Sequence, residues 1–150
     1  MTTFTDAEIA YLRRSALDGP LGRLATVGPH GRPHVAPLGV MYDPATESIL
    51  IGGHTGSNMA GSKKFRDAQR HPDVALVVDD LASTEPWLPR GIEIRGHADT
   101  FTDGGEETGG RLEAPFPWDP AWIRIRPRRI LAWGIDTGSF ELVARDVDGA

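Results

Sequence analysis

The stretch that decides the fold is ILIGGHTGSNMAGSKKFRDAQRHPDVALVVDDL, residues 49–81. Its apolar start, within residues 48–53, predicts a strand, and the glycine-rich segment that follows predicts a loop. Phe65 and Ala68 among polar neighbours predict a short helix that ends near Arg70, before Pro72. The continuous apolar run at 74–80 then predicts a strand buried on both faces.

Positive charge gathers at the start of this short helix. The chain has fourteen arginines but only two lysines, the adjacent Lys63 and Lys64. We expect a flexible loop that exposes backbone N–H groups, then the positive end of a helix and two ammonium groups, which together make an anion site. A solvated helix start is the alternative that these residues leave open. The run GSNMAGSK (56–63) nearly matches a nucleotide-binding phosphate loop, but Ser62 comes before Lys63 and no βαβ unit surrounds it, which disfavours a nucleoside triphosphatase.

The N-terminal third predicts one helix and a hairpin. Thr5 and Glu8 have the spacing of a capping box, so a helix is expected over residues 6–17. Residues 23–27 and 34–42 flank a Gly/Pro turn and predict a β-hairpin. Because Pro37 cannot donate to a ladder, its strand is expected either at a sheet edge or to open the ladder at that residue.

The C-terminal half predicts more strands. Alternating residues at 91–101 predict one strand, and residues 122–136 predict one or two more. The acidic, glycine-rich residues 103–110 predict a surface loop, and the polar tail from Glu141 is expected to fray. About six short strands and two short helices predict a mainly β, barrel-like fold.

Length and composition limit the class of protein. The 150 residues predict a single domain, 1–150, with a core of about residues 6–137. A net charge of -5 argues against general nucleic-acid binding, and the absence of cysteine excludes thiolate chemistry. We find no signal peptide or apolar membrane span and therefore expect a cytoplasmic protein.

The histidines do not predict a metal site. His30 and His34 are four residues apart, which is a ligand spacing on helices, but Gly31 and Pro33 break any helix there. No catalytic motif of nucleophile, base or paired carboxylates is present either. If the chain is an enzyme, a bound cofactor is expected to supply the chemistry.

Together with residues 49–81, three further segments carry a family resemblance: GRLATVGPHGRPHVAPLGVMYD (22–43), RGIEIRGHAD (90–99) and IRIRPRRILAWGI (123–135). In this order, the segments resemble the pyridoxamine 5′-phosphate oxidase-like split-barrel proteins, most closely the small actinobacterial members that use coenzyme F420. The resemblance implies a six-stranded split β-barrel of the FMN-binding, Greek-key type. It also implies a homodimer with two cofactor sites at the interface. The arginine-rich C-terminal signature of true pyridoxamine phosphate oxidases is missing, which argues against vitamin B6 as substrate.

The resemblance also implies the cofactor-binding residues. Ser62, Lys63 and Lys64 would hold the cofactor phosphate, and Gly53 and His54 would lie where the preceding strand meets it. The backbone of one strand would run under the ring system and offer polar groups to its edge; its residues are Val35, Ala36, Pro37 and Leu38.

Two features of the sequence, a tryptophan and a pair of arginines, each allow two interpretations. Trp87 stands where related deazaflavin proteins place an aromatic near the ring, and an ordinary half-buried tryptophan is the alternative. Strand alternation places Arg124 and Arg126 on the face opposite Ile123 and Ile125. This arginine pair is expected either to meet the anionic oligoglutamate tail of F420 or to form the solvated face of an edge strand.

Three functions remain open. The first is an F420-dependent reductase that passes a hydride to a conjugated small molecule such as an enone or a tetrapyrrole. The second keeps the fold but binds FMN at the same phosphate site. The third is a non-catalytic protein that carries a cofactor or pigment. The sequence identifies no catalytic acid.

Overall fold

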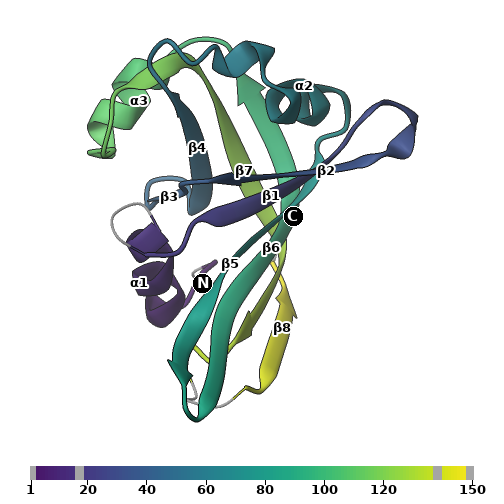
Figure 1. Ribbon diagram of the computed structural model, residues 1–150. Coiled ribbons are helices and arrows are strands. Elements are labelled where there is room, and N and C mark those ends of the chain that lie inside the picture. The colour runs from purple at the N-terminus through teal and green to yellow at the C-terminus, as the bar shows by residue number, and fades with distance from the viewer. Residues whose placement is uncertain (1–2, 16–18, 137–139, 148–150) are drawn as a thin grey trace.

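The computed structural model describes residues 3–15, 19–136 and 140–147. These residues form one antiparallel sheet of eight strands in the order β2-β1-β5-β6-β7-β4-β3, with β8 also paired to β7 (Figure 1). The two ends of this order, β2 and β3, do not pair, so the sheet is not closed. The strands are β1 (Gly22–Val27), β2 (Pro33–Leu38), β3 (Met41–Asp43), β4 (Ser48–His54), β5 (Asp73–Thr84), β6 (Trp87–Phe101), β7 (Trp118–Trp133) and β8 (Leu142–Asp146).

Three α-helices accompany the sheet in the described residues: α1 (Asp6–Ser15), α2 (Lys63–Arg70) and α3 (Gly105–Arg111). Two short 3-10 turns, η1 (Pro29–Gly31) and η2 (Met59–Gly61), precede β2 and α2. Figure 1 shows α2 and α3 near one end of the sheet and the turn of the β5–β6 hairpin at the opposite end.

The mainly β architecture is confirmed, with eight strands in the described residues where about six were expected and three α-helices where two or more were expected. The expected loop at 103–110 contains α3. Glu106 and Glu107 lie in its first turn, where their negative charges stabilise the positive end of the helix. Gly105 permits the helix to lie against β7, because a Cβ there would meet the Asp119 carbonyl oxygen at 1.9 Å. The tail expected to fray from Glu141 contains β8.

The predicted double-sided burial of residues 74–80 is also wrong. Val74, Leu76 and Val78 are buried, whereas Ala75 and Val77 between them are only half-buried. In this antiparallel sheet one face points into the core and the other is largely left open, so a continuous apolar run still alternates. Val74, Leu76 and Val78 join Leu24 and Ile92 in the main core.

Other predictions of local structure are confirmed. The helix at the N-terminus begins with the capping box, in which Thr5 Oγ1 accepts a hydrogen bond from the Glu8 N–H at 3.1 Å. Its predicted end at residues 16 and 17 lies outside the described residues. Strand β2 is an edge strand, as Pro37 predicts. The strands 23–27 and 34–42 do pair, although the second ends at Leu38 and Met41 starts β3.

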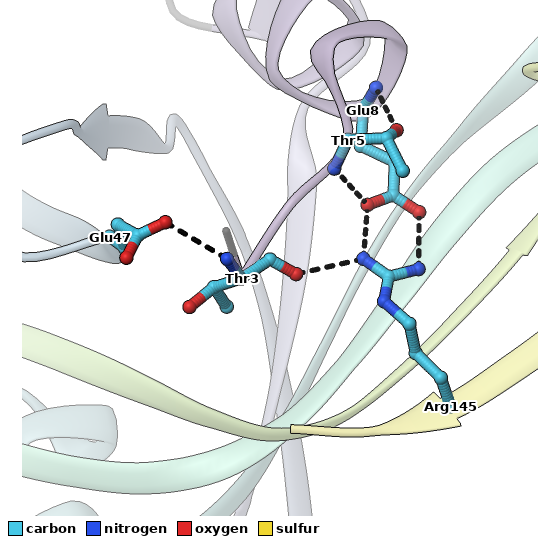
Figure 2. A network of polar contacts seen from close by, with 5 residues as sticks. All are labelled: Thr3, Thr5, Glu8, Glu47 and Arg145. Carbon is cyan, nitrogen blue, oxygen red and sulfur yellow. Dashed lines mark hydrogen bonds and ion pairs between the residues drawn. The ribbon is translucent and has the colours of Figure 1, made fainter. Parts of the chain in front are cut away.

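A buried carboxylate ties the two ends of the chain together (Figure 2). Glu8 is 1% exposed and accepts hydrogen bonds from the Thr5 N–H at 3.0 Å and from Arg145 at 2.9 and 2.5 Å. Arg145 lies on β8 and also donates to the Thr3 carbonyl at 2.9 Å. Strand β8 is therefore anchored to the start of α1, which accounts for an ordered tail in a polar sequence.

Candidate functional site

The loop between β4 and α2 is held in place by a carboxylate from β7. Asp119 accepts hydrogen bonds from the Gly56 N–H at 2.8 Å and from the Met59 N–H at 2.9 Å. These bonds, that of Met59 first, hold the pKa of Asp119 below its usual value. The Thr55 N–H is also bonded, to the Pro117 carbonyl at 2.9 Å. The expectation of a flexible loop with exposed N–H groups is therefore wrong, because the polar groups of the loop are largely satisfied from within the protein.

Sequence reasoning missed Asp119 because its partners, Gly56 and Met59, are 63 and 60 positions away. Only the pairing of β4 with β7, with His54 opposite Trp118, brings the acid beneath the loop. An aspartate before a proline carries no local signal for such a role.

Ser62 begins α2 as its N-cap. Its Oγ accepts a hydrogen bond from the Phe65 N–H at 3.4 Å and donates one to the Met59 carbonyl at 2.7 Å. The helix start predicted at Ser62–Lys64 is thus confirmed, and the hydroxyl is engaged in forming it.

Lys63 is paired within the protein. Its ammonium lies 3.3 Å from each oxygen of Asp67, a side chain that is 2% exposed. Asp67 also accepts a hydrogen bond from Thr26 Oγ1 on β1 at 3.0 Å. Lys63 therefore supplies the counter-charge for a buried acid between α2 and β1.

Lys64, in contrast, has no ion-pair partner among the described residues. Its side chain is half-buried, and this burial lowers the pKa of its ammonium. Within the same part of the chain, the backbone N–H groups of Lys63 and Lys64 also find no acceptor, as is usual for the first helical positions. The start of α2 thus combines one unpaired, partly desolvated cation with free helix N–H groups, which is a favourable arrangement for an anion.

Gly53 and His54 lie at the end of β4, directly before the ordered loop. A Cβ at Gly53 would lie 2.8 Å from Ser57 Oγ and 3.1 Å from Met59 Cβ, so the loop packs closely against this glycine. The His54 ring stacks on Phe116, with centroids 5.3 Å apart and planes 17° apart. Phe116 is a second contact that the sequence did not reveal.

The predicted ring-binding strand, residues 35–38, is the free edge of the sheet. It pairs on one side with β1, where Ala36 faces Leu24 and Leu38 faces Gly22. Val35 is 63% exposed and Pro37 is also exposed. The other side of this strand has no partner among the described strands, so its backbone groups are available to a ligand.

Trp87 lies apart from the other predicted residues. It is 66% exposed, so it is not an ordinary half-buried tryptophan, and it pairs with Thr84 at the turn of the β5–β6 hairpin. The twelve residues of β5 separate that turn from the end of α2 by about 35 Å, at the usual rise of a strand. Within a single chain, α2 contacts β2 and the turn η2 that follows β4, whereas Trp87 lies at the far hairpin turn.

Arg124 and Arg126 of β7 lie on the face opposite Ile123 and Ile125, both fully buried, as strand alternation predicts. Strand β7 lies between β6 and β4, so the interpretation as an edge strand is wrong. Arg126 is paired with Asp99 at 2.8 Å. Arg124 lies over the Trp122 ring at 5.2 Å, and its Nε is buried without a hydrogen-bond partner in the described residues.

Two searches of the described residues gave negative findings. They contain no group of three or more His, Asp or Glu side chains placed to hold a metal ion. None of their helices has the length and apolar character needed to span a membrane.

The fold and the site can now be compared with known proteins. Residues 10–139 match the family described as pyridoxamine 5′-phosphate oxidase, and the chain belongs to this family. A curated relative from Streptomyces rimosus subsp. rimosus is named 5a,11a-dehydrotetracycline/5a,11a-dehydrooxytetracycline reductase. It is 41% identical over 145 residues, which cover 96% of this chain and 93% of the relative.

Solved structures support the fold. An F420 reductase is 25% identical with a TM-score of 0.54, over 78% of this chain and 94% of the other. An FAD-binding protein from Mycobacterium smegmatis is 23% identical with a TM-score of 0.62, over 86% of this chain and 95% of the other. The predicted mainly β, split-barrel fold is confirmed. Together with the reductase relative, these likenesses support an oxidoreductase of this family.

Proposed function

We propose that the protein is an F420-dependent reductase of small conjugated molecules. The observation that carries this proposal is the half-buried Lys64 at the start of α2, which has no ion-pair partner among the described residues. Helix α2 contacts β2, whose outer edge is unpaired in the described sheet. The residues fit a cofactor that combines a phosphate with a flat polar ring. The likeness to a reductase of dehydro-tetracyclines and to an F420 reductase supports the chemistry.

Each predicted residue has a distinct task in this proposal. Lys64 and the N–H groups at the start of α2 bind the phosphate, and Lys63 adds the remaining ammonium hydrogens that Asp67 does not take. Ser62 fixes the helix start rather than the phosphate itself. Asp119 shapes the loop that leads from Gly53 and His54 to this helix.

The strand at residues 35–38 orients the ring by hydrogen bonds from its free edge. When bound in its reduced form, F420 supplies a hydride to one carbon of a conjugated double bond, solvent supplies a proton to the other, and the cofactor is oxidised by two electrons. The protein contributes orientation and exclusion of water, since none of its predicted site residues is placed as a general acid.

We further propose that two chains form the complete site. Trp87 is exposed at the far hairpin turn and, within one chain, is separated from the phosphate-binding residues by the length of β5. A second chain is required for Trp87 to meet the ring. Light scattering at micromolar concentration should give the mass of a dimer, and a monomer would contradict this arrangement.

Two other functions have support of their own. FMN presents a phosphate to the same residues, so a flavoenzyme of the same fold is the nearest alternative. A non-catalytic cofactor carrier is favoured by the lack of an acid or base and by the likeness to an FAD-binding protein.

Parallel fluorescence titrations of the cofactor-free protein with F420 and with FMN distinguish these functions. Preferential binding of F420, followed by oxidation of reduced F420 on addition of an enone, is the expected result. Preferential binding of FMN would replace the proposal with the flavoenzyme. Tight F420 binding without turnover of any conjugated acceptor would favour the carrier.

A further inference from the structure

A mostly apolar cavity of about 230 Å3 lies beside the proposed cofactor site. It is bounded by the end of α1, the β2–β3 connection, β4 and the segment before β7. Its principal side chains are Leu21, Val40, Met41, Pro115, Phe116 and Trp118. None of the described residues that line it carries a charge, so this lining suits a neutral ligand.

One residue of this apolar lining carries a hydroxyl group. Ser15, the last residue of α1, lines the cavity and is 5% exposed. Its Oγ is buried and has no hydrogen-bond partner in the described part of the chain. A buried hydroxyl without a partner destabilises a protein by about 1–3 kcal/mol, so this hydroxyl calls for an explanation. A ligand oxygen in the cavity would supply the missing partner.

Two contacts join the cavity to the proposed cofactor site. Gly52 lines the cavity and directly precedes Gly53. A Cβ at Gly52 would meet the Trp118 ring at 2.0 Å, so glycine lets this ring form a wall of the cavity. On another wall, Phe116 stacks on His54. A ligand in the cavity would therefore lie next to the end of β4, where the proposed cofactor site begins.

We propose that this cavity binds the molecule to be reduced: a neutral, mostly apolar conjugated carbonyl compound, with its oxygen accepting a hydrogen bond from Ser15. A cavity of about 150 Å3 holds one benzene ring, so about 230 Å3 suits a skeleton of two fused rings, or that portion of a larger molecule. This inference rests on the proposed reductase function and adds to it the class of acceptor and the residue that recognises it.

The test uses two bicyclic probes of similar size, one with hydrogen-bond acceptors and one without. Coumarin carries a lactone group with a carbonyl oxygen and a ring oxygen, and naphthalene carries no oxygen. Each is titrated into the cofactor-free protein and followed by quenching of tryptophan fluorescence, since Trp118 lines the cavity. Three proteins are compared with the wild type: Ser15→Ala, Ser15→Leu and the control Thr102→Leu, whose side chain is exposed and does not line the cavity.

We expect wild type to bind both probes. Ser15→Ala should weaken the binding of coumarin about three- to tenfold, the effect of one hydrogen bond, and leave the affinity for naphthalene unchanged. Ser15→Leu should weaken both probes more than tenfold by filling the cavity, and its thermal unfolding shows whether it folds. Thr102→Leu should change neither affinity.

The inference is overturned if wild type binds neither probe, or if Ser15→Ala leaves the affinity for coumarin unchanged. An F420 titration of the same samples separates this failure from that of the proposed function. Binding of F420 without binding of coumarin would leave the reductase proposal intact and remove the acceptor cavity. If the protein binds coumarin but binds neither F420 nor FMN, the cavity is not the site of an acceptor for a cofactor-dependent reduction, and the inference is overturned.

Discussion

Replacing Lys63 and Lys64 one at a time separates cofactor binding from folding. The two lysines are adjacent in sequence, but only Lys63 is paired with a buried acid, at 3.3 Å. Lys64 has no partner in the described residues and is half-buried. Lys64→Ala should therefore lower the affinity for F420 alone, whereas Lys63→Ala should lower both this affinity and the stability of the fold.

The magnitudes follow from these contacts. A hydrogen bond between an ammonium and a phosphate contributes about 1.5–3 kcal/mol, so Lys64→Ala should weaken F420 binding roughly 10- to 150-fold. Lys63→Ala leaves Asp67, 2% exposed, with only Thr26 as a side-chain partner. Because the Lys63 side chain is itself 46% exposed, solvent screens the pair, and we expect a loss of about 1–2 kcal/mol rather than the larger cost of a fully buried pair.

Fluorescence titration with F420 and thermal unfolding of the cofactor-free protein measure the two effects. For a chain of this size, Lys63→Ala should lower Tm by about 3–6 °C, whereas Lys64→Ala should leave it nearly unchanged. Arg66→Ala, which removes an exposed charge from the same helix, is the matched control. An unchanged affinity in Lys64→Ala, or an unchanged Tm in Lys63→Ala, would refute the respective part of this reasoning.

Three further predictions concern stability. Ser15→Ala should raise the free energy of unfolding by about 1 kcal/mol, because it removes a buried hydroxyl without a partner; a lower Tm in calorimetry would contradict this. Arg145→Ala should lower the free energy of unfolding by about 2 kcal/mol in urea titrations, because Glu8 is then buried without its counter-charge. Adding Glu8→Gln to this variant should restore part of the lost stability. Hydrogen bonds from Arg90 hold the pKa of Asp80 below its ordinary value of 3.8, so ionised Asp80 contributes stability above that pH and loses it as the pH falls further. Asp80→Asn should accordingly lose less stability than wild type between about pH 4 and pH 2. If the free energy of unfolding falls equally steeply with pH in both proteins over this range, the prediction is wrong.

The proposed dimer gives the exposed Trp87 a structural reason. A tryptophan that is 66% exposed at a hairpin turn is unusual for a monomer, in which large aromatic side chains are mostly buried. If Trp87 meets the ring bound to a second chain, its exposure ends when two chains associate. Trp87→Ala should then weaken cofactor binding while the secondary structure of each chain is retained.

Several features of the fold were predictable because their signals are local. The capping box of Thr5 and Glu8, the N-cap of Ser62 and the edge position of Pro37 each depend on backbone chemistry within a few residues. Errors arose where distant partners decide the outcome. Residues 103–110 contain a helix because Gly105 packs on β7, and residues 142–146 form a strand because Arg145 reaches Glu8 at the other end of the chain.

The sequence by itself determined the mainly β class, the short helix that begins with two lysines, and the resemblance that places a cofactor phosphate there. It treated Lys63 and Lys64 as equivalent, because nothing in their order along the chain distinguishes them. Only the tertiary structure paired one of them with Asp67, placed Asp119 beneath the loop, and buried the Ser15 hydroxyl in a residue that lines an apolar cavity. The physical reason is that pairing and burial depend on which distant residues the sheet brings together, and these determine whether a charge or a hydroxyl is free to bind a ligand.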